Sequence, residues 1–229
     1  MNKNNFKNRI LVSITGYRDR DWQSKLKEIE RFRINKIALF LSRFKPKQRK
    51  KIYIALLKSK IKSIPFVHAR HDMRKEEFNF LIKHFNSLKF TIHEDAFIDL
   101  KKWKGLYKYL YLEMNVDNFI SKTVDVRKIG GFCVDLSHFK IQEEKWSKEF
   151  EYIIKRKNIS HYFACNHLNG YSYQKNKDLH TVKSLKDFDY LKTLPRFLFS
   201  QTIAIETDNS IADQLKFKKY LIKFLNKEK

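Results

Sequence analysis

The chain has 229 residues, of which 42% are hydrophobic and 15% aromatic, which is typical of one folded domain and excludes a disordered chain. No apolar stretch approaches the ~18 residues of a membrane helix, and the first residues do not resemble a signal peptide. The net charge of +24 favours encounters with polyanions such as nucleic acids. A composition rich in lysine, asparagine and isoleucine is also what an AT-rich genome produces, so charge alone does not identify the partner.

Eight short runs rich in β-branched or aromatic residues predict buried strands along the chain. In chain order these runs are Ile10–Ile14, Lys36–Leu41, Ile64–Val67, Phe90–Ile92, Tyr109–Leu112, Gly131–Val134, His161–Cys165 and Thr202–Ile205. Cys133 and Cys165 both fall inside such runs, which predicts buried, reduced thiols and a cytoplasmic protein.

Amphipathic stretches with helical periodicity separate most of these runs. They are Asp21–Phe32, Pro46–Lys60, Glu76–Leu88, Gln142–Lys157, Lys186–Phe197 and Ile211–Leu225. This alternation predicts an α/β protein, a (β/α)8 TIM barrel forming a single compact domain over residues 1–229. A doubly wound open sheet is the structural alternative, and the even spacing of eight strands argues against it. The polar stretch Leu168–Leu185 is long for a barrel loop, which suggests that this loop has a functional role.

Polar residues that can bind metals lie at or just after the ends of successive predicted strands. They are His68, His93, Glu113, Asp135, His138, His167 and Glu206. The carboxyl ends of parallel barrel strands meet at one mouth, so we expect these side chains to converge there. Imidazoles and carboxylates gathered without a bound cation would repel or desolvate one another, so the pattern predicts a metal site.

Other residues near these positions have different interpretations. If the segment Lys104–Asn115 continues a helix, Glu94 replaces Glu113 as the carboxylate of the site. We interpret His71 and His84 as structural residues, and His161 opens a strand, which places it at the opposite end of the barrel.

Two local pairs sharpen the prediction of a metal site. Asp135-Leu-Ser-His138 places a carboxylate at a strand end and an imidazole one helical turn later. Asp178-Leu-His180 places a second pair in an extended segment, where alternate residues project together. Histidine and carboxylate ligands without cysteine suit Zn²⁺, Mn²⁺ or Fe²⁺.

Three motifs resemble those of the endonuclease IV family of apurinic/apyrimidinic endonucleases, within the xylose-isomerase-like TIM barrel superfamily. They are Phe132-Cys-Val-Asp135-Leu-Ser-His138, His167-Leu-Asn169 followed by Asp178-Leu-His180, and Ile203-Ala-Ile-Glu206-Thr207. The resemblance implies up to three zinc ions, with Mn²⁺ or Fe²⁺ as alternatives. Their ligands would be His68, His93 and Glu113 for the first, Glu113, Asp135, His167 and Glu206 for the second, and His138, Asp178 and His180 for the third.

The resemblance also implies an activity: a zinc-dependent endodeoxyribonuclease of DNA base-excision repair, a hydrolase that cleaves the phosphodiester 5′ to abasic sites. Glu113, Asp135 and Glu206 would be its catalytic carboxylates. Four arginines in loops after the first three strands would bind DNA phosphates: Arg18, Arg20, Arg43 and Arg70. We expect a monomer whose partner is abasic duplex DNA. The chain departs from the family at Gly170, at Met114-Asn-Val-Asp-Asn118 and at Thr181-Val-Lys-Ser-Leu185.

Two other functions remain open on the sequence. In a metal-dependent sugar isomerase or epimerase of the same superfamily, one metal on Glu113, Asp135, His167 and Glu206 would bind a keto-sugar. A barrel that binds nucleic acid or a partner without catalysis is the third interpretation. About three metals per chain would favour the nuclease, and one would favour the isomerase.

Overall fold

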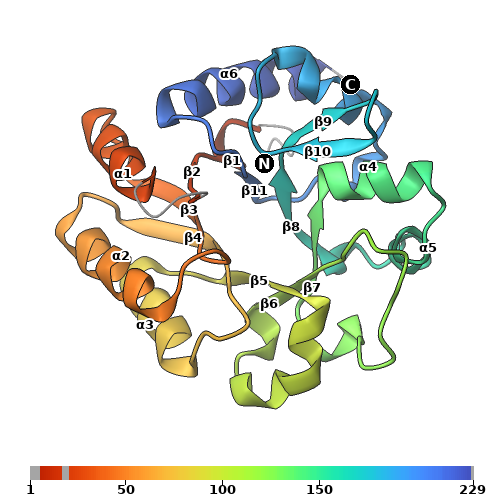
Figure 1. The fold of residues 1–229 in the computed structure, drawn as a ribbon, viewed down its shortest axis with the longest axis horizontal. Helices are drawn as coiled ribbons and strands as arrows, with labels where there is room; N and C mark the ends of the chain where they lie inside the picture. Colours follow the sequence, from red (N-terminus) through yellow and green to blue (C-terminus); the bar gives the residue numbers. More distant parts are fainter. Residues whose placement is uncertain (1–5, 17–20, 228–229) are drawn as a thin grey trace.

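The computed structural model describes residues 6–16 and 21–227. Nine parallel strands form one sheet, in the order β1-β11-β8-β7-β6-β5-β4-β3-β2. The strands are β1 (Ile10–Leu11), β2 (Ser13–Ile14), β3 (Lys36–Phe40), β4 (Ser63–His68), β5 (Lys89–His93), β6 (Leu110–Glu113), β7 (Gly131–Asp135), β8 (Phe163–Leu168) and β11 (Ile203–Ile205). The sheet wraps around a central axis (Figure 1).

The first predicted strand closes the barrel. β1 pairs with β11, β2 pairs with β3, and the two halves are separated only by Val12, whose carbonyl accepts the N–H of Ala38. One continuous segment therefore joins the two edges of the sheet, so the barrel contains eight strand positions. The predicted α/β barrel is confirmed, and the open doubly wound sheet is wrong.

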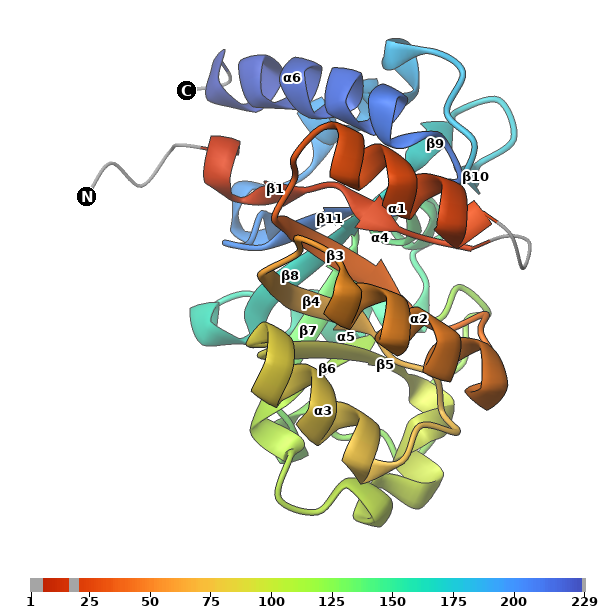
Figure 2. The same ribbon diagram turned by 90° about the vertical axis from the view of Figure 1, so that its left-hand side faces the viewer.

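Helices cover the outside of the barrel after most of the strands (Figures 1 and 2). The α-helices are α1 (Asp21–Arg31), α2 (Pro46–Lys58), α3 (Lys75–Phe85), α4 (Leu136–Glu144), α5 (Lys148–Ile154) and α6 (Ile211–Lys227). The 3-10 helices are η1 (Phe6–Asn8), η2 (Glu94–Trp103), η3 (Tyr107–Tyr109), η4 (Val126–Lys128), η5 (Ser160–Tyr162), η6 (Leu185–Thr193) and η7 (Arg196–Leu198). None of the helices in the described ranges is both long and apolar enough to span a membrane.

Two predicted helices are wrong in detail. The stretch Gln142–Lys157 is divided between two helices. Asp135 caps α4, which begins six residues before Gln142, and Ser147 caps α5 by accepting the N–H of Phe150. The stretch Lys186–Phe197 forms the tighter 3-10 turns η6 and η7, separated at Pro195, which has no backbone N–H to continue a helix. Ser147 interrupts a stretch of helical periodicity, and serine favours the N-cap position of a helix. It was the sequence signal for a second helix that the periodicity did not reveal.

The polar stretch after β8 contains an antiparallel hairpin rather than an irregular loop. Its strands are β9 (Gly170–Ser172) and β10 (Lys177–Leu179). β10 lies beside α4, and the hairpin stands at the end of the barrel to which the strands point (Figures 1 and 2). A Cβ at Gly170 would lie 3.0–3.2 Å from side-chain atoms of Val182, Leu179 and Asp187, so a larger residue there would push these neighbours aside.

Two separate apolar layers hold the barrel. The larger packs the helices against the outside of the sheet, and it includes Trp103, Phe78 and Phe90. The smaller cluster consists of Leu11, Ala38, Phe40, Phe66, Cys133, Cys165 and Ala204. Both cysteines are free and fully buried, as predicted.

Candidate metal centre

The predicted site residues form the next layer above the smaller apolar cluster. Side chains on a strand alternate between its two faces, so a residue two positions after an interior one also points inward. His68 follows Phe66, Asp135 follows Cys133 and His167 follows Cys165 in this way. Parallel register then sets neighbours side by side, with His93 opposite Glu113 and Asp135 opposite His167.

Glu113 lies at the centre of this layer, and only 2% of the residue is exposed. Its Oε2 lies 3.2 Å from His167 Nδ1 and 3.6 Å from His68 Nε2. The same oxygen is 3.9 Å from His93 Nε2, and Oε1 is 3.6 Å from His138 Nδ1. Glu113 ends strand β6, so the alternative in which Lys104–Asn115 continues a helix is wrong. One buried carboxylate is shared among four imidazoles.

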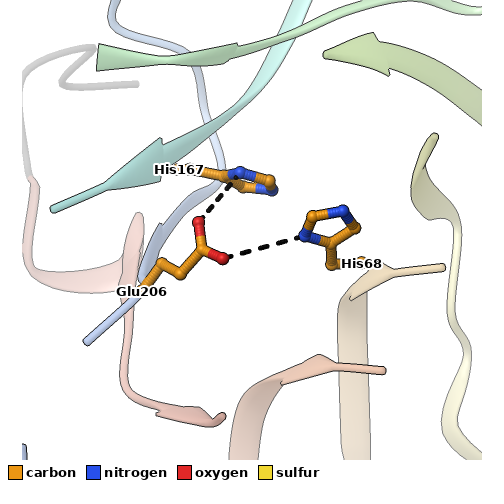
Figure 3. Close-up of side chains that lie close together, drawn as sticks. All are labelled: His68, His167 and Glu206. Carbon is orange, nitrogen blue, oxygen red and sulfur yellow. Dashed lines mark ion pairs between the residues drawn. The ribbon is translucent and has the colours of Figure 1, made fainter. Parts of the chain in front are cut away.

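Glu206 approaches the same imidazoles from the opposite side of the barrel. Its Oε2 is 3.2 Å from His167 Nδ1, and its Oε1 is 3.8 Å from His68 Nδ1 (Figure 3). Glu206 directly follows β11, the strand that pairs with both β1 and β8. The site therefore draws on strands from both halves of the chain.

Three groups of side chains have ligand atoms that all lie within 4.8 Å of one another. They are His68 with His93 and Glu113, Glu113 with Asp135, His167 and Glu206, and His68 with His167 and Glu206. The first two are the sets that the resemblance implies for two metal ions, and Glu113 belongs to both. Among the residues that the structure describes, the third implied set, His138 with Asp178 and His180, is not gathered in this way.

The members of that third set lie close to the cluster but in two parts. His138 points to Glu113 and also lies 4.0 Å from Asp135. Asp178 and His180 pair with each other at 3.0 Å, and His180 Nδ1 is 3.4 Å from the backbone oxygen of Glu206. The hairpin therefore places Asp178 and His180 at the edge of the cluster. These two residues and His138 do not come together as a three-ligand group.

Strong opposing charges act within the cluster. Burial by itself would raise the pKa of Glu113 and Glu206, but neighbouring imidazoles, above all His167, hold both well below the usual range. Burial would likewise lower the pKa of His138, but the carboxylates of Asp135 and Glu113 raise it. In His93 burial prevails and the pKa falls. Without a cation, protons on imidazoles balance the carboxylates, and metal binding would have to displace them.

The cluster also contains buried polar atoms that have no hydrogen-bond partner, which is a second indication of a metal site. Several buried nitrogen and oxygen atoms of the cluster have no hydrogen-bond partner; they are His68 Nδ1, His93 Nδ1, His138 Nδ1, both ring nitrogens of His167, and Glu113 Oε2. Buried polar atoms are rarely left unsatisfied. Among these atoms, the Nδ1 of His68, His138 and His167 each lie 3.2–3.8 Å from a carboxylate oxygen of Glu113 or Glu206. The donor set of imidazoles and carboxylates suits Zn²⁺, Mn²⁺ or Fe²⁺.

A supporting shell that sequence reasoning missed fixes Asp135. Its Oδ1 accepts hydrogen bonds from the backbone N–H groups of Ser137 and His138 and from the Ser137 hydroxyl. Its Oδ2 accepts one at 3.0 Å from Asn169 Nδ2, which is fully buried. Asn169 lies in the motif His167-Leu-Asn169, and Ser137 lies in the motif Asp135-Leu-Ser-His138. The side-chain amide of Asn169 and the capping ability of Ser137 were the sequence signals for this supporting role. Such partners orient a ligand before metal binds.

Glu94 is buried next to the cluster but serves another role. Its Oε1 accepts the backbone N–H of Asn115 at 2.9 Å, and it belongs to none of the three groups. Burial raises its pKa to about 7; the Asn115 bond opposes this, and the charges of Asp117 and Glu149 add to it. The carboxylate that the structure brings to the imidazoles is Glu113, while Glu94 ties down the loop after β6.

This raised pKa predicts a pH-dependent stability. The folded protein holds the Glu94 proton more tightly than the unfolded chain, so the free energy of unfolding falls as pH rises from about 4.5 to about 7. Replacing Glu94→Gln should therefore raise it by roughly 1–3 kcal/mol at pH 8 and by less than about 1 kcal/mol at pH 5. Denaturant unfolding of metal-free protein at both pH values measures this. A variant less stable than the parent at pH 8 would contradict it.

Two of the four predicted DNA-binding arginines lie on the rim of the barrel. Arg43 lines a depression that also contains His180, Glu206 and Asp208. Arg70 lines a second one, beside His93. Arg18 and Arg20 fall outside the described residues.

Two aromatic residues close in sequence to the site, Phe44 after Arg43 and Tyr171 after Asn169, are buried, so neither is available to stack on a base. His84 is an exposed residue of α3, His71 is exposed beside Arg70, and His161 lies before β8, at the far end from the cluster.

No family model matches the chain, and no curated protein is detectably similar to it in sequence. The class of protein is therefore defined by fold and site: a parallel α/β barrel with a buried histidine–carboxylate cluster at the carboxyl ends of its strands, able to hold metal ions.

Proposed function

We propose that this protein is a metal-dependent phosphodiester hydrolase that acts on DNA and cleaves 5′ to abasic sites, as the endonuclease IV family does. The observation that carries the proposal is the position of Glu113, shared between a group with His68 and His93 and a group with Asp135, His167 and Glu206. A carboxylate between two ligand groups is suited to bridge two ions, which phosphodiester hydrolysis exploits. We further propose zinc as the metal.

The residues of the chain would divide the work as follows. The two groups that share Glu113 would hold the ions, which supply Lewis acidity and an activated water to the phosphodiester. Asp135, fixed by Asn169 and Ser137, would keep the second group oriented. Arg43 and Arg70 on the rim would bind flanking phosphates, and the net charge of +24 would hasten encounter with DNA. We place this monomeric enzyme in the cytoplasm, where Cys133 and Cys165 would stay reduced.

One observation favours the hydrolase over a sugar isomerase. A single-metal isomerase would need only Glu113, Asp135, His167 and Glu206. The cluster also brings His68 and His93 to Glu113, with their Nε2 atoms 3.1 Å apart. Two imidazoles this close have no evident role beside a single metal on the other group, and they suit a second ion.

The direct test is incubation of the purified protein with a duplex that carries one abasic-site analogue. We expect cleavage on the 5′ side of the analogue that survives removal of magnesium and is lost on strong zinc chelation. The same duplex without the analogue should stay intact. Absence of cleavage by protein loaded with Zn²⁺, Mn²⁺ or Fe²⁺, together with one metal per chain and isomerisation of a keto-sugar, would overturn the proposal.

A further inference from the structure

Two aromatic side chains stand exposed on the same side of the barrel rim. Trp146, between α4 and α5, is 76% exposed, and Phe119, in the loop after β6, is 60% exposed. The other two tryptophans of the chain, Trp22 and Trp103, are buried. Large aromatic side chains usually gain stability from burial, so these two require a separate explanation.

The backbone conformation of Trp146 is also unusual. Trp146 ends α4 in a left-handed conformation, with φ of 50°, and its N–H donates to the carbonyl of Glu143 while that of Ser147 donates to Gln142. Glycine or asparagine normally occupies such a position, because a bulky side chain is strained there. The Trp146 ring makes an edge contact with Phe150, at 5.4 Å, and otherwise faces outward. A bulky residue therefore occupies a strained backbone position although its ring packs little.

Buried polar groups hold the two aromatic segments together. The N–H of Phe119 donates to Glu149 Oε1 at 3.2 Å, and Glu149 is fully buried at the start of α5. The N–H of Lys148 donates to Asn118 Oδ1 at 3.0 Å. Figure 1 shows the loop after β6 running next to α5. The segments that carry Phe119 and Trp146 are therefore joined to each other, and we refer to the two residues as the aromatic patch.

Exposed lysines lie close to the two aromatic residues in sequence. They are Lys122, three residues after Phe119, and Lys145 and Lys148, one residue before and two residues after Trp146. Of the acidic side chains close to the aromatic patch in sequence, Glu143 and Glu144 both pair with Lys140, at 2.8 and 2.7 Å. Asp117 and the buried Glu149 both accept the N–H of Phe119. Aromatic faces flanked by lysines match the bases and phosphates of a single nucleic-acid strand.

The patch also lies within reach of the metal centre. α4 begins after its N-cap Asp135 and carries His138, and the six helical positions from His138 to its last residue, Glu144, span about 9 Å. Trp146 follows two residues later. Phe119 follows Glu113 by six residues. A DNA strand with a phosphate at the cluster would pass the patch a few nucleotides away.

We propose that Trp146 and Phe119 form a stacking platform for unpaired bases of the DNA strand that flanks the cleavage site, with Lys122, Lys145 and Lys148 along its phosphates. The platform rests on the proposed function for its ligand, since it assumes a DNA substrate at the cluster. Stacking needs no particular base, so the platform would bind single-stranded DNA regardless of sequence.

The experiment measures binding of single-stranded oligonucleotides to full-length protein in the presence of EDTA, so that no cleavage intervenes. Because Trp146 is the exposed tryptophan, DNA should quench the tryptophan emission of the parent, and the variant Trp146→Phe should lose most of that quenching but keep most of the affinity. Trp146→Gly should weaken binding about tenfold, and Phe119→Ala comparably.

Glycine suits the left-handed backbone, so Trp146→Gly should also keep or raise the melting temperature. The control is Phe32→Ala, which removes an exposed aromatic ring flanked by Arg31 and Arg33 after the end of α1; it should leave DNA affinity unchanged. Unchanged DNA affinity in Trp146→Gly, or DNA binding without quenching in the parent, would overturn the platform. So would a dimer that Trp146→Gly dissociates while DNA affinity stays the same.

The result separates the platform from the hydrolase. If no duplex is cleaved but Trp146→Gly still weakens DNA binding tenfold, the platform stands and the hydrolase is wrong. If abasic duplex is cleaved and Trp146→Gly binds and cleaves like the parent, the hydrolase stands and the platform is wrong.

Discussion

Replacing Glu113→Gln should lower the rate of abasic-site cleavage by roughly a thousandfold or more, about 4 kcal/mol of activation free energy. Glu113 is shared by the group with His68 and His93 and by the group with Asp135, His167 and Glu206, so its loss removes a ligand from each of the two proposed ions at once. The amide keeps the shape of the side chain but not its charge. Cleavage rate and bound metal per chain, measured together, check this prediction.

Glu94→Gln is the matched control for this variant. It makes the same chemical change in a buried glutamate that lies next to His93 yet outside the cluster, where it accepts the N–H of Asn115. We expect it to keep its metals and most of its cleavage rate. Should Glu113→Gln retain both metals and full activity, the shared carboxylate would not be the centre of the site.

The second large effect is on stability. Protein stripped with a chelator should gain about 4 kcal/mol of unfolding free energy when Zn²⁺ is present at a thousand times its dissociation constant. In a domain of this size, that gain corresponds to a rise in melting temperature of about 10 °C. The buried atoms of His68, His167 and Glu113 that have no hydrogen-bond partner are the reason, because ligation to metal ions would give them partners. Thermal unfolding with and without metal measures the shift.

The same titration has a pH dependence with a defined sign. His167 has a raised pKa, so it holds a proton that an incoming ion must displace. Metal affinity should fall as pH drops, and calorimetry at pH 7 should detect released protons. We expect two tightly bound ions, since the set of His138, Asp178 and His180 is not gathered. Binding of one ion, or no thermal shift with Zn²⁺, Mn²⁺ or Fe²⁺, would contradict the two-ion centre.

The inward-facing residues of the strands were predictable because side chains alternate between the two faces of a strand, so one known position determines the others. Each ligand stands two residues after an interior residue, as His68 does after Phe66 and His167 after Cys165, so one register fixes both layers. The helices were less predictable. The cap at Ser147 and the left-handed turn at Trp146 divide a stretch whose apolar period is continuous. Local backbone geometry overrides periodicity at such points.

The sequence by itself determined the order of strands, the residue types of the rim and the face to which each one points, since these follow from local pattern and parallel pairing. Only the tertiary structure decided which carboxylate the imidazoles share. Glu94 and Glu113 both follow apolar segments, but Glu113 ends a strand inside the barrel while Glu94 opens η2 and turns to Asn115. Distances between side chains from distant strands depend on closure of the barrel, which no local pattern encodes.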